Sequence, residues 1–547
     1  MIQESWEAVT PQYTHFNEII EDVIGITPSS FINVQPRLNE ALNCFVSLQG
    51  FNKLLVVNGP DNSVYRQLIA NTITHKTKLS AIATDSIDEK VLLGSYRADS
   101  KGEIEFFNPG FLQSEENSYV VISANLLLAN PTCWLQLKSA LLGQTISPLN
   151  LDLKKPITTS LDYHFKGKII VLGDRDQLSE LEYLESELHT GLSLFSEIET
   201  EIALNNRTIS SYLAFLNWLT KYYNLPSLSS EAIHRLMIAG ARHTEDQNYM
   251  PLDILWYRAL FEEARVVCSS DKLDFHTLDK AIDQRYYRES YLPERALSDI
   301  FDGQVVIETE GECVGQVNGL TVIDLPGHPL SYGEPARISC VIHFGDGDIS
   351  DVERKAELGG NLHAKGMMIM QAFVSSALNL DEPLPYSASV VFEQSYCEVD
   401  GDSASLAELC SFVSALSEYP INQQIAVTGA VDQFGRVQAV GGLNEKIEGF
   451  YHVCKHQGFT GNQGVILPNS NLKNLALHKD VAESIKKGEF HIWSVSNVDE
   501  AIPIIMDKPF RGDDESSVIA KIAQRIENFA AHEQPQGIVD RIKNWFV

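Results

Sequence analysis

Short apolar runs alternate with amphipathic stretches in the first third of the chain. Uninterrupted apolar segments occur at Lys53–Gly59, Tyr119–Ser123 and Lys168–Gly173. Continuous apolar runs of this length are typical of parallel strands buried on both faces. A helical pattern from about Ser63 to Thr74 follows the first run. Strands that alternate with helices predict a parallel α/β sheet.

The pattern changes twice further along the chain. Apolar residues recur at helical spacing in Leu192–Leu204, Ile209–Tyr223, Ser230–Ala241 and Leu252–Cys268, which predicts a helical lobe. We interpret Asp283–Glu294, which is dense in charge and tyrosine, as a connector. From about Ile300 the expected strands are 304–308, 320–324, 336–344 and 387–392, and the expected helices are 366–378, 405–417, 443–457 and 471–487. Strands and helices mixed in this way predict an α+β domain.

These changes divide the chain into five parts. We expect an N-terminal segment at residues 1–45, an α/β lobe at 46–188, a helical lobe at 189–291, an α+β domain at 292–507 and a C-terminal amphipathic helical extension at 508–547. The helix of the extension carries one apolar stripe, formed by Val518, Ile519, Ile522, Ile526 and Phe529. We expect that stripe to pack on its own domain or on a neighbouring subunit. The predicted fold class is multidomain, with α/β and α+β parts.

Composition narrows the classes of function. The 547 residues carry a net charge of −31, which argues against a nucleic-acid partner because acidic surfaces repel phosphates. No apolar run approaches the roughly 18 residues of a membrane span, and the N-terminus has no secretory pattern. The eight cysteines are scattered without a C-x-x-C pair, so neither a disulfide framework nor a metal site is expected. We therefore expect a cytoplasmic protein with no membrane partner.

Ser403 is the first candidate for chemistry. It lies in the segment Asp400-Gly-Asp-Ser-Ala-Ser405, directly before a predicted helix. Unpaired backbone N–H groups at a helix N-terminus can stabilise the oxyanion of a tetrahedral intermediate. By itself the segment is also compatible with an ordinary turn that caps a helix.

Lys446 is the second candidate. On the predicted helix it lies at the edge of the apolar stripe formed by Leu443, Ile447, Phe450 and Cys454. A partly desolvated lysine has a lowered pKa, and its neutral amine can take a proton from a serine. By itself a lysine on a helix is more often solvated.

Several motifs in order give these two residues a context. From about Leu292 to Met506 the chain resembles the proteolytic domain of Lon peptidases, and in particular the B-type branch. The matching motifs are Val314–Leu320, Glu357–Gly366, Asp400–Ser405, Val427–Gly429, Gly435–Val437, Gly441–Lys446 and Ile466–Pro468. Lys446 follows Ser403 by 43 positions, the spacing that this family shows.

The resemblance implies a role for each matched residue. Ser403 would be the nucleophile and Lys446 its general base. Thr428 would hydrogen-bond the lysine, and Asp400 would lie close to the dyad and set its charge state or block the resting site; as alternatives, Thr428 is a plain strand residue and Asp400 a turn former. His363 suggests a Ser–His pair, but the family's dyad contains no histidine, so we favour a structural role, or one near the site, for it.

Residues 30–290 resemble the AAA+ module of Lon peptidases in the order of their elements, but the nucleotide-binding residues differ. A phosphate-binding loop needs G-x-x-x-x-G-K-S/T. The segment Gly59–Arg66 has Val64, Tyr65 and Arg66 at the last three positions, and Asp61 adds a negative charge. Ser123 and Ala124 stand where acidic residues are expected after the second strand. We therefore predict a degenerate AAA+ module with no ATP cofactor.

Three functions remain open at this point. The first is a serine endopeptidase that cleaves unfolded or loosely folded polypeptides without ATP, as a homo-oligomer that the resemblance makes a hexameric ring. The second is a catalytically silent scaffold or assembly protein with the Lon fold. The third is an ATP-dependent protease with an atypical nucleotide site.

Overall fold

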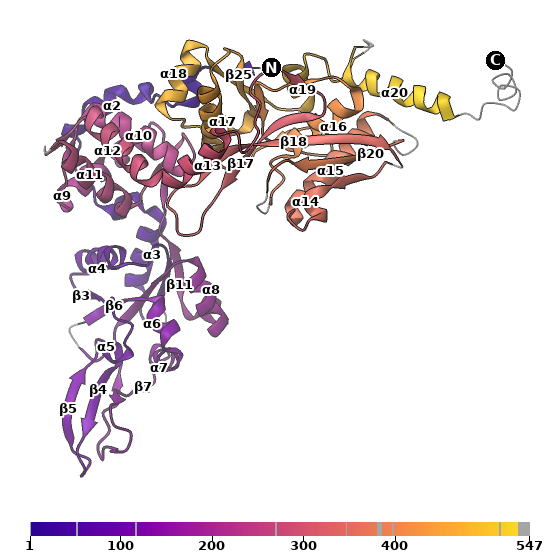
Figure 1. Cartoon of the computed structure of the whole chain (residues 1–547). Coiled ribbons are helices and arrows are strands. Elements are labelled where there is room, and N and C mark those ends of the chain that lie inside the picture. The colour runs from indigo at the N-terminus through magenta and orange to yellow at the C-terminus, as the bar shows by residue number, and fades with distance from the viewer. Residues whose placement is uncertain are drawn as a thin grey trace, which may run out of the picture.

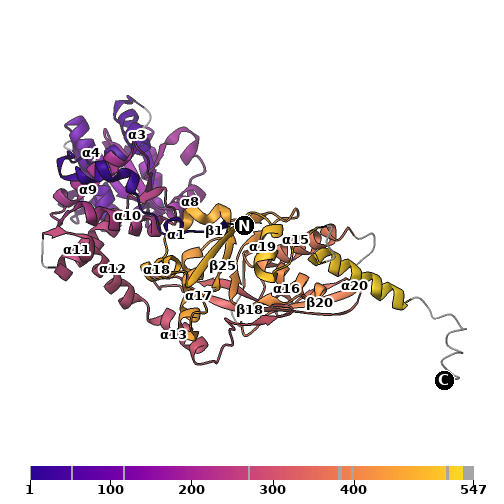
Figure 2. The ribbon, with the colours of Figure 1, turned by 90° about the horizontal axis from the view of Figure 1, so that it is seen from above.

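The protein consists of an α/β lobe, a helical lobe and a larger C-terminal domain. The computed structural model describes residues 2–50, 53–114, 117–268, 271–345, 347–379, 385–395, 399–512 and 516–533. The helical lobe lies beside the C-terminal domain, and the α/β lobe extends away from both (Figure 1). Viewed from above, helices α12 (Phe275–Glu289) and α13 (Tyr291–Phe301) bridge the helical lobe and the C-terminal domain (Figure 2).

The α/β lobe is built on a five-stranded parallel sheet. In spatial order its strands are β11 (Leu194–Glu197), β2 (Leu54–Asn58), β10 (Lys168–Gly173), β6 (Asn117–Ser123) and β3 (Ser80–Ala83). Side chains alternate between the two faces of each strand. On one face they pack with α3 (Pro36–Ser47) and α4 (Ser63–Thr77). On the other they pack with α6 (Ala124–Ala129), α7 (Pro131–Leu141) and α8 (Arg175–Leu184). Both faces are covered, as the continuous apolar runs predict.

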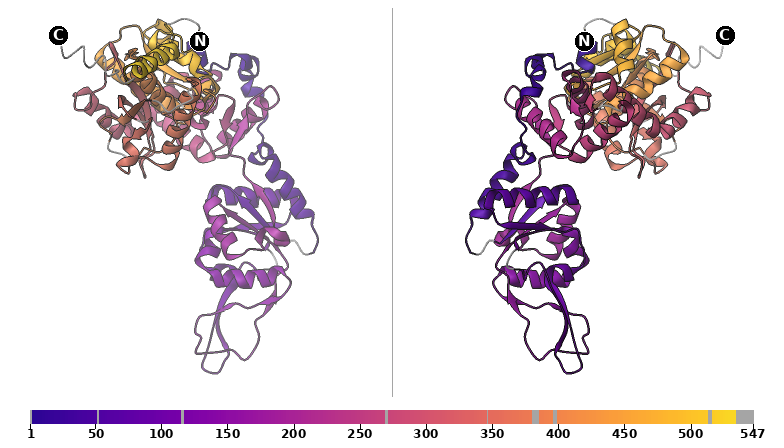
Figure 3. Two further views of the ribbon diagram at one scale, coloured as in Figure 1. Left: turned by 90° about the vertical axis from the view of Figure 1, so that its right-hand side faces the viewer. Right: turned by 90° about the vertical axis from the view of Figure 1, so that its left-hand side faces the viewer.

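An arm projects from the far end of this lobe, as the side views show (Figure 3). It contains a three-stranded sheet in the order β5 (Ile104–Pro109), β4 (Gly94–Ala98) and β8 (Leu149–Asn150).

The helical lobe contains α9 (Ile209–Tyr222), α10 (Ser230–Thr244), α11 (Ile254–Cys268) and α12. Its buried residues share one apolar cluster with the α3–α4 face of the sheet. The two lobes are therefore packed against each other and not merely tethered.

The C-terminal domain is organised around an eight-stranded mixed sheet. In spatial order its strands are β1 (Ile2–Gln3), β26 (Phe490–Val495), β25 (Gln463–Pro468), β22 (Ile425–Val427), β17 (Gln316–Ile323), β18 (Tyr332–Phe344), β20 (Tyr386–Phe392) and β19 (Ile349–Asp351). One face packs against α15 (Asn361–Ala377) and α16 (Ser405–Ser417). The other packs against α17 (Leu443–Gln457) and α18 (Lys479–Lys487).

The N-terminal segment, expected as a unit of its own, runs across all three parts. Strand β1 pairs antiparallel with β26 of the C-terminal domain. Helix α2 (Asn17–Glu21) contacts α9 and α10 of the helical lobe, and α3 covers the α/β sheet. The segment therefore ties the three parts together.

The C-terminal helix α20 (Val518–Glu533) packs on its own domain. Val518 and Ile522 are buried in the cluster that contains α16. Arg525 Nη1 donates to the carbonyls of Ala415 and Leu416, at 2.9 Å each, in the last turn of α16. Of the two packing partners that the sequence leaves open, this chain uses its own domain; the side chain of Phe529 lies outside the described residues.

Four segments differ from the expected elements. Residues 192–204, expected as a helix, contain strands β11 and β12 (Glu201–Ala203), and β11 pairs with β2 at the edge of the parallel sheet. The expectation was wrong because a short apolar run is compatible with the helical period and with the strand period. The predicted connector Asp283–Glu294 is helical, and two of its charges, Arg285 and Arg288, pair with Glu263 of α11. Residues 304–308 form no strand, and the helix expected at 471–487 begins only at Lys479.

Candidate active site

Ser403 is held in a tight turn immediately before α16. Gly401 has a φ of 118°, a conformation that favours glycine. The carbonyl of Ser403 accepts a hydrogen bond of 2.9 Å from the amide of Gly429, and the amide of Leu406 returns one of 3.0 Å to the carbonyl of Gly429. The turn is thereby fastened to the segment that follows strand β22.

Lys446 reaches this turn from helix α17. Its side chain is 2% exposed, and Nζ donates a hydrogen bond of 3.1 Å to Oγ of Ser403. Burial lowers the pKa of the ammonium from its ordinary value of 10.5 to about 8. The edge of the apolar stripe is therefore desolvated, as the sequence pattern predicts.

The backbone amides around Ser403 differ in their availability. The amide of Ser405 donates to the carbonyl of Asp402 at 3.0 Å, and that of Leu406 is bound to Gly429. Within the described part of the chain, no hydrogen bond occupies the amides of Ser403 and Ala404. The free donors that the sequence predicts are thus the two amides at the nucleophile turn itself.

Thr428 and Asp400 lie near Ser403 but make other contacts than the resemblance implies. Thr428 is buried, and its Oγ1 donates to the carbonyl of Ser403 at 3.4 Å; among the described residues it makes no hydrogen bond with Lys446. The Asp400 carboxylate accepts from the amides of Leu362 and Gly401, at 3.2 and 3.0 Å. It therefore caps the N-terminus of α15, and both residues support the backbone around the candidate nucleophile.

The Asp400 contact also explains one glycine of the preceding motif. A Cβ atom at Gly360 would lie 2.3 Å from Oδ1 of Asp400. Glycine at this position lets the carboxylate approach the start of α15.

His363 belongs to a separate buried cluster behind α16. Its ring nitrogens lie 3.2 Å from Asp351 Oδ2 and 3.5 Å from Glu408 Oε1. Burial favours the neutral imidazole, but these two carboxylates outweigh it and raise the pKa of His363. Burial also raises the pKa of Glu408 to about 7. The cluster braces the helix that follows Ser403, which agrees with the structural role favoured for His363.

A cavity of about 920 Å³ opens beside the Ser403–Lys446 pair. The C-terminal domain contributes Ser403, Lys446 and Asp402 to its wall, and the helical lobe contributes Arg242 and Tyr286. The wall combines charged and apolar surface, and the cavity is large enough for several residues of a peptide.

The loop between β2 and α4 is filled by its own side chains. The carboxylate of Asp61 is 3% exposed, forms an ion pair with Arg66 and accepts a hydrogen bond of 2.5 Å from Ser123 Oγ. The side chain of Asn62 accepts from the amides of Val64 and Tyr65, at 3.0 and 3.3 Å. In a phosphate-binding loop such amides face the phosphates. An anionic side chain and occupied amides do not suit a magnesium–nucleotide ligand.

Tyr65 stands at the position of the phosphate-binding lysine. Its ring is buried, and its hydroxyl accepts a hydrogen bond of 3.2 Å from the amide of Ile254, where α11 begins. This contact joins the α/β lobe directly to the helical lobe.

Within the described ranges, no cluster of three or more His, Cys, Asp or Glu side chains is placed to hold a metal ion. The helices of those ranges include none with the length and apolar character needed to span a bilayer.

Comparison with known families matches both parts of the architecture. Residues 85–198 match the LonB-like AAA domain, and residues 392–508 match the Lon protease (S16) C-terminal proteolytic domain. The fold and the matched site region define a serine peptidase domain of the S16 type joined to an AAA-type module.

Individual relatives extend this match to nearly the whole chain. A protein of Escherichia coli (strain K12) named as a Lon protease homolog is 36% identical over 99% of both chains. A second protein so named, from Haemophilus influenzae, is 36% identical over 86% of this chain and 78% of its own length. The archaeal Lon protease of Thermococcus kodakarensis is 30% identical over 40% of this chain. The chain belongs to the Lon protease family.

Sequence reasoning did not find several buried polar groups on the two helices that carry the pair. Glu445 and Glu448 flank Lys446 on α17, and both bind Arg242 of the helical lobe. Glu408 lies on α16 within the His363 cluster. Acidic residues on a helix resemble solvated surface in a sequence, and no local pattern marks the distant partners that bury them.

Proposed function

We propose that the protein is a serine endopeptidase in which Ser403 is the nucleophile and Lys446 the general base. The observation that carries this proposal is the 3.1 Å contact between Lys446 Nζ and Ser403 Oγ, made by a lysine that is 2% exposed. A buried lysine with a pKa of about 8 is partly neutral near physiological pH, so its amine can accept the serine proton.

Each step of the reaction then has a group to perform it. Ser403 Oγ attacks the carbonyl carbon of the scissile peptide bond while Lys446 takes the hydroxyl proton. The amides of Ser403 and Ala404, which make no hydrogen bond within the described part of the chain, would donate to the oxyanion. Lys446 returns the proton to the leaving amine, and water then releases the acyl group by the same route. Thr428 and Asp400 act as supporting residues that hold the backbone of the turn.

The proposed substrates are unfolded or loosely folded polypeptides. The cavity at the pair opens between two parts of the protein and has a mixed charged and apolar wall, which suits an extended chain better than one small charged molecule. A folded protein would first have to be unfolded to reach Ser403.

We further propose that the protein works without ATP hydrolysis or any other cofactor. The Asp61–Arg66 ion pair and the Ser123 hydrogen bond fill the loop where a nucleotide would bind. The AAA-type module then serves as a scaffold for a homo-oligomer, a hexameric ring by resemblance to the family, in the cytoplasm. The acidic net charge of −31 agrees with a protein that binds no nucleic acid.

The test is cleavage of unfolded casein by the purified protein, with and without MgATP, beside Ser403→Ala. We expect cleavage that is lost in the variant and unaffected by MgATP. Cleavage that requires MgATP would favour an ATP-dependent protease with an atypical nucleotide site. No cleavage in either condition would favour a silent scaffold, the remaining alternative.

A further inference from the structure

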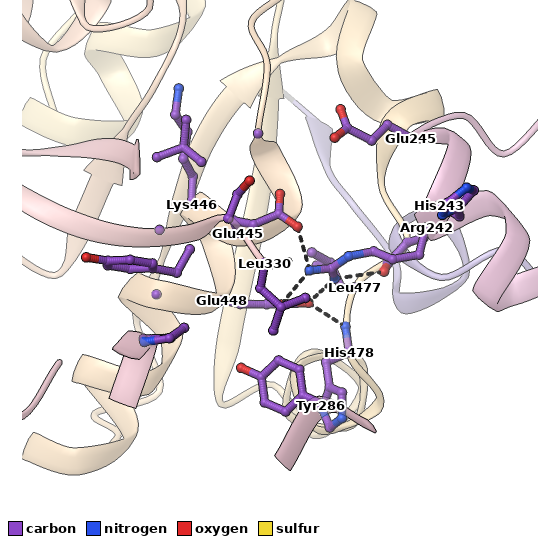
Figure 4. Close-up of a pocket in the computed structure, with 18 of the residues that line it drawn as sticks. Arg242, His243, Glu245, Tyr286, Leu330, Glu445, Lys446, Glu448, Leu477 and His478 are labelled. Atoms are coloured by element: carbon purple, nitrogen blue, oxygen red, sulfur yellow. Dashed lines mark hydrogen bonds and ion pairs between the residues drawn. The ribbon is translucent and has the colours of Figure 1, made fainter. Parts of the chain in front are cut away.

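Helix α17 carries acidic residues on both sides of Lys446, and one arginine of the helical lobe binds them both. Arg242, in the last turn of α10, places Nη2 at 2.7 Å from Glu445 Oε1. Its Nη1 lies 2.5 Å from Glu448 Oε1, and Nη2 lies 3.0 Å from Glu448 Oε2. Figure 4 shows the guanidinium between the two carboxylates, with Lys446 directed away from them.

The same guanidinium also reaches the loop before α18. Nη1 of Arg242 donates to the carbonyl of Ala476 at 3.3 Å, and the amide of His478 donates to Glu448 Oε1 at 2.8 Å. The side chains of Glu445 and Glu448 are only 17% and 11% exposed. Burial disfavours the charged form of Glu448, but Arg242 and its hydrogen bonds outweigh burial and lower the pKa of that carboxyl. Arg242 is therefore the counterion of a largely buried, charged network.

A neighbouring face of α17 is in contact with strand β18. A Cβ atom at Gly333 would lie 2.2 Å from the carbonyl oxygen of Glu445, and one at Gly449 would lie 2.0 Å from the carbonyl oxygen of Gly333. The two backbones thus approach as closely as glycine allows. The first turns of α17 are thus in contact with both β18 and Arg242.

This placement bears directly on the reactive atoms. Within the described part of the chain, Ser403 Oγ is the sole hydrogen-bond partner of Lys446 Nζ. No second acceptor among those residues orients the amine, so its position depends on the position of α17. A shift of the helix by a fraction of an ångström changes the distance between Nζ and Oγ.

We propose that Arg242 is a positioning residue for the Ser403–Lys446 pair and that the helical lobe is, through it, a working part of the peptidase. Arg242 touches neither reacting atom. It fixes the helix that carries the base. Through this contact the helical lobe acts on catalysis, although the proposed enzyme hydrolyses no nucleotide. This inference rests on the proposed function.

The experiment compares Arg242→Met, which keeps the aliphatic stem, with Arg242→Lys, which keeps the charge. The matched control is Lys473→Met, because Lys473 forms a 2.9 Å ion pair with Asp246 across the same interface and does not bind α17. For each full-length protein we would measure kcat and KM on an unfolded peptide substrate, thermal stability, and amide hydrogen exchange in the first two turns of α17.

We expect Arg242→Met to lower kcat roughly tenfold or more and to change KM by a smaller factor, because the base is misplaced while Arg242 is only one of many residues in the cavity wall. Arg242→Lys should recover a substantial part of kcat, and Lys473→Met should resemble the parent protein. Exchange in α17 should be faster in Arg242→Met alone. A kcat unchanged in Arg242→Met, or lowered equally in Lys473→Met, would overturn the inference.

Two further arms keep the result decisive. The combined Glu445→Gln and Glu448→Gln variant removes the same contacts from the α17 side, so adding Arg242→Met to it should cause little further loss; full additivity would contradict the coupling. If the Arg242→Met protein does not fold, the combined Glu445→Gln and Glu448→Gln variant takes its place in the kinetic comparison. If the parent protein cleaves nothing, the peptidase proposal fails, while unchanged hydrogen exchange in α17 would count separately against Arg242.

Discussion

Replacing Lys446 by methionine is expected to abolish peptide cleavage and to stabilise the C-terminal domain. The side chain is 2% exposed, and burial lowers the pKa of its ammonium from 10.5 to about 8. Below pH 8 the folded protein therefore holds a positive charge in surroundings that disfavour it, which costs free energy of folding. Methionine has a similar shape and no charge to desolvate.

The size of the gain follows from the pKa. Each pKa unit corresponds to about 1.36 kcal/mol, so a fall from 10.5 to about 8 corresponds to about 3 kcal/mol. Between these two values the unfolded chain keeps a proton that the folded chain has lost, so the stability of the parent protein rises with pH through this window. The advantage of Lys446→Met should be full below about pH 8 and disappear near pH 10.5.

Thermal unfolding of the two proteins at about pH 7 and about pH 10 measures this difference. For a domain of roughly 150–250 residues, about 3 kcal/mol corresponds to a rise in Tm of about 6–12 °C. The matched control is Lys455→Met on the same helix, because the Lys455 side chain is 51% exposed and pairs with Asp480. That replacement should change the free energy of unfolding by no more than about 0.5 kcal/mol.

Equal stability of Lys446→Met and the parent protein at neutral pH would refute this reasoning. So would a gain that stays the same up to about pH 10. Either result would mean that Lys446 is a solvated cation in the resting protein. The proposed base would then remain protonated at neutral pH, and the Ser403–Lys446 mechanism would lose its physical basis.

Three other predictions test neighbouring features. The kcat/KM for peptide cleavage should rise about tenfold per pH unit below the Lys446 pKa of about 8 and level off above it, because the neutral amine is the base; a limb near 6.5 would point to a histidine. Burial raises the pKa of the Glu408 carboxyl from 4.5 to about 7, so the stability of the parent protein falls as pH rises through this window. Glu408→Gln should therefore raise the free energy of unfolding by up to about 3 kcal/mol above pH 7 and by little below pH 4.5. Thermal unfolding across this range measures the difference, and an equal gain at both ends would contradict the prediction. Millimolar MgATP should leave Tm unchanged, because Asp61 and Arg66 fill the loop, whereas a rise with nucleotide concentration would show binding.

The helices at the candidate site were among the most predictable elements of the fold. Helices α16 and α17 have the predicted bounds, Ser405–Ser417 and Leu443–Gln457, because each has a long amphipathic pattern that begins directly after a glycine-containing turn. The apolar runs of the α/β sheet were equally clear, because strands buried on both faces contain few polar residues. The pattern of residues 192–204 does not distinguish a helix from a strand, because two short strands at a sheet edge carry too few residues to separate the helical period from the strand period.

The contacts of the site were less predictable than its residues. Motif order brought Ser403 and Lys446 together and Asp400 near them, but it assigned Thr428 a hydrogen bond to the lysine and did not show what the Asp400 carboxylate binds. In the structure Thr428 binds the Ser403 carbonyl and Asp400 caps α15. Which of several nearby acceptors a short side chain reaches depends on backbone geometry at the scale of an ångström. Arg242 was not foreseeable, because its partners lie more than 200 positions away.

The pairing of β1 with β26 has a consequence for how the chain is synthesised. Gln3 and His491, which meet across these strands, are 488 positions apart. At roughly 5–20 residues per second, the ribosome would take about 25–100 s to supply the partner of the first strand. Until then the strand has no sheet to join, while the α/β and helical lobes can already fold. A fusion tag placed before Ile2 would also lie beside the peptidase domain and not beside the lobe that comes first in the sequence.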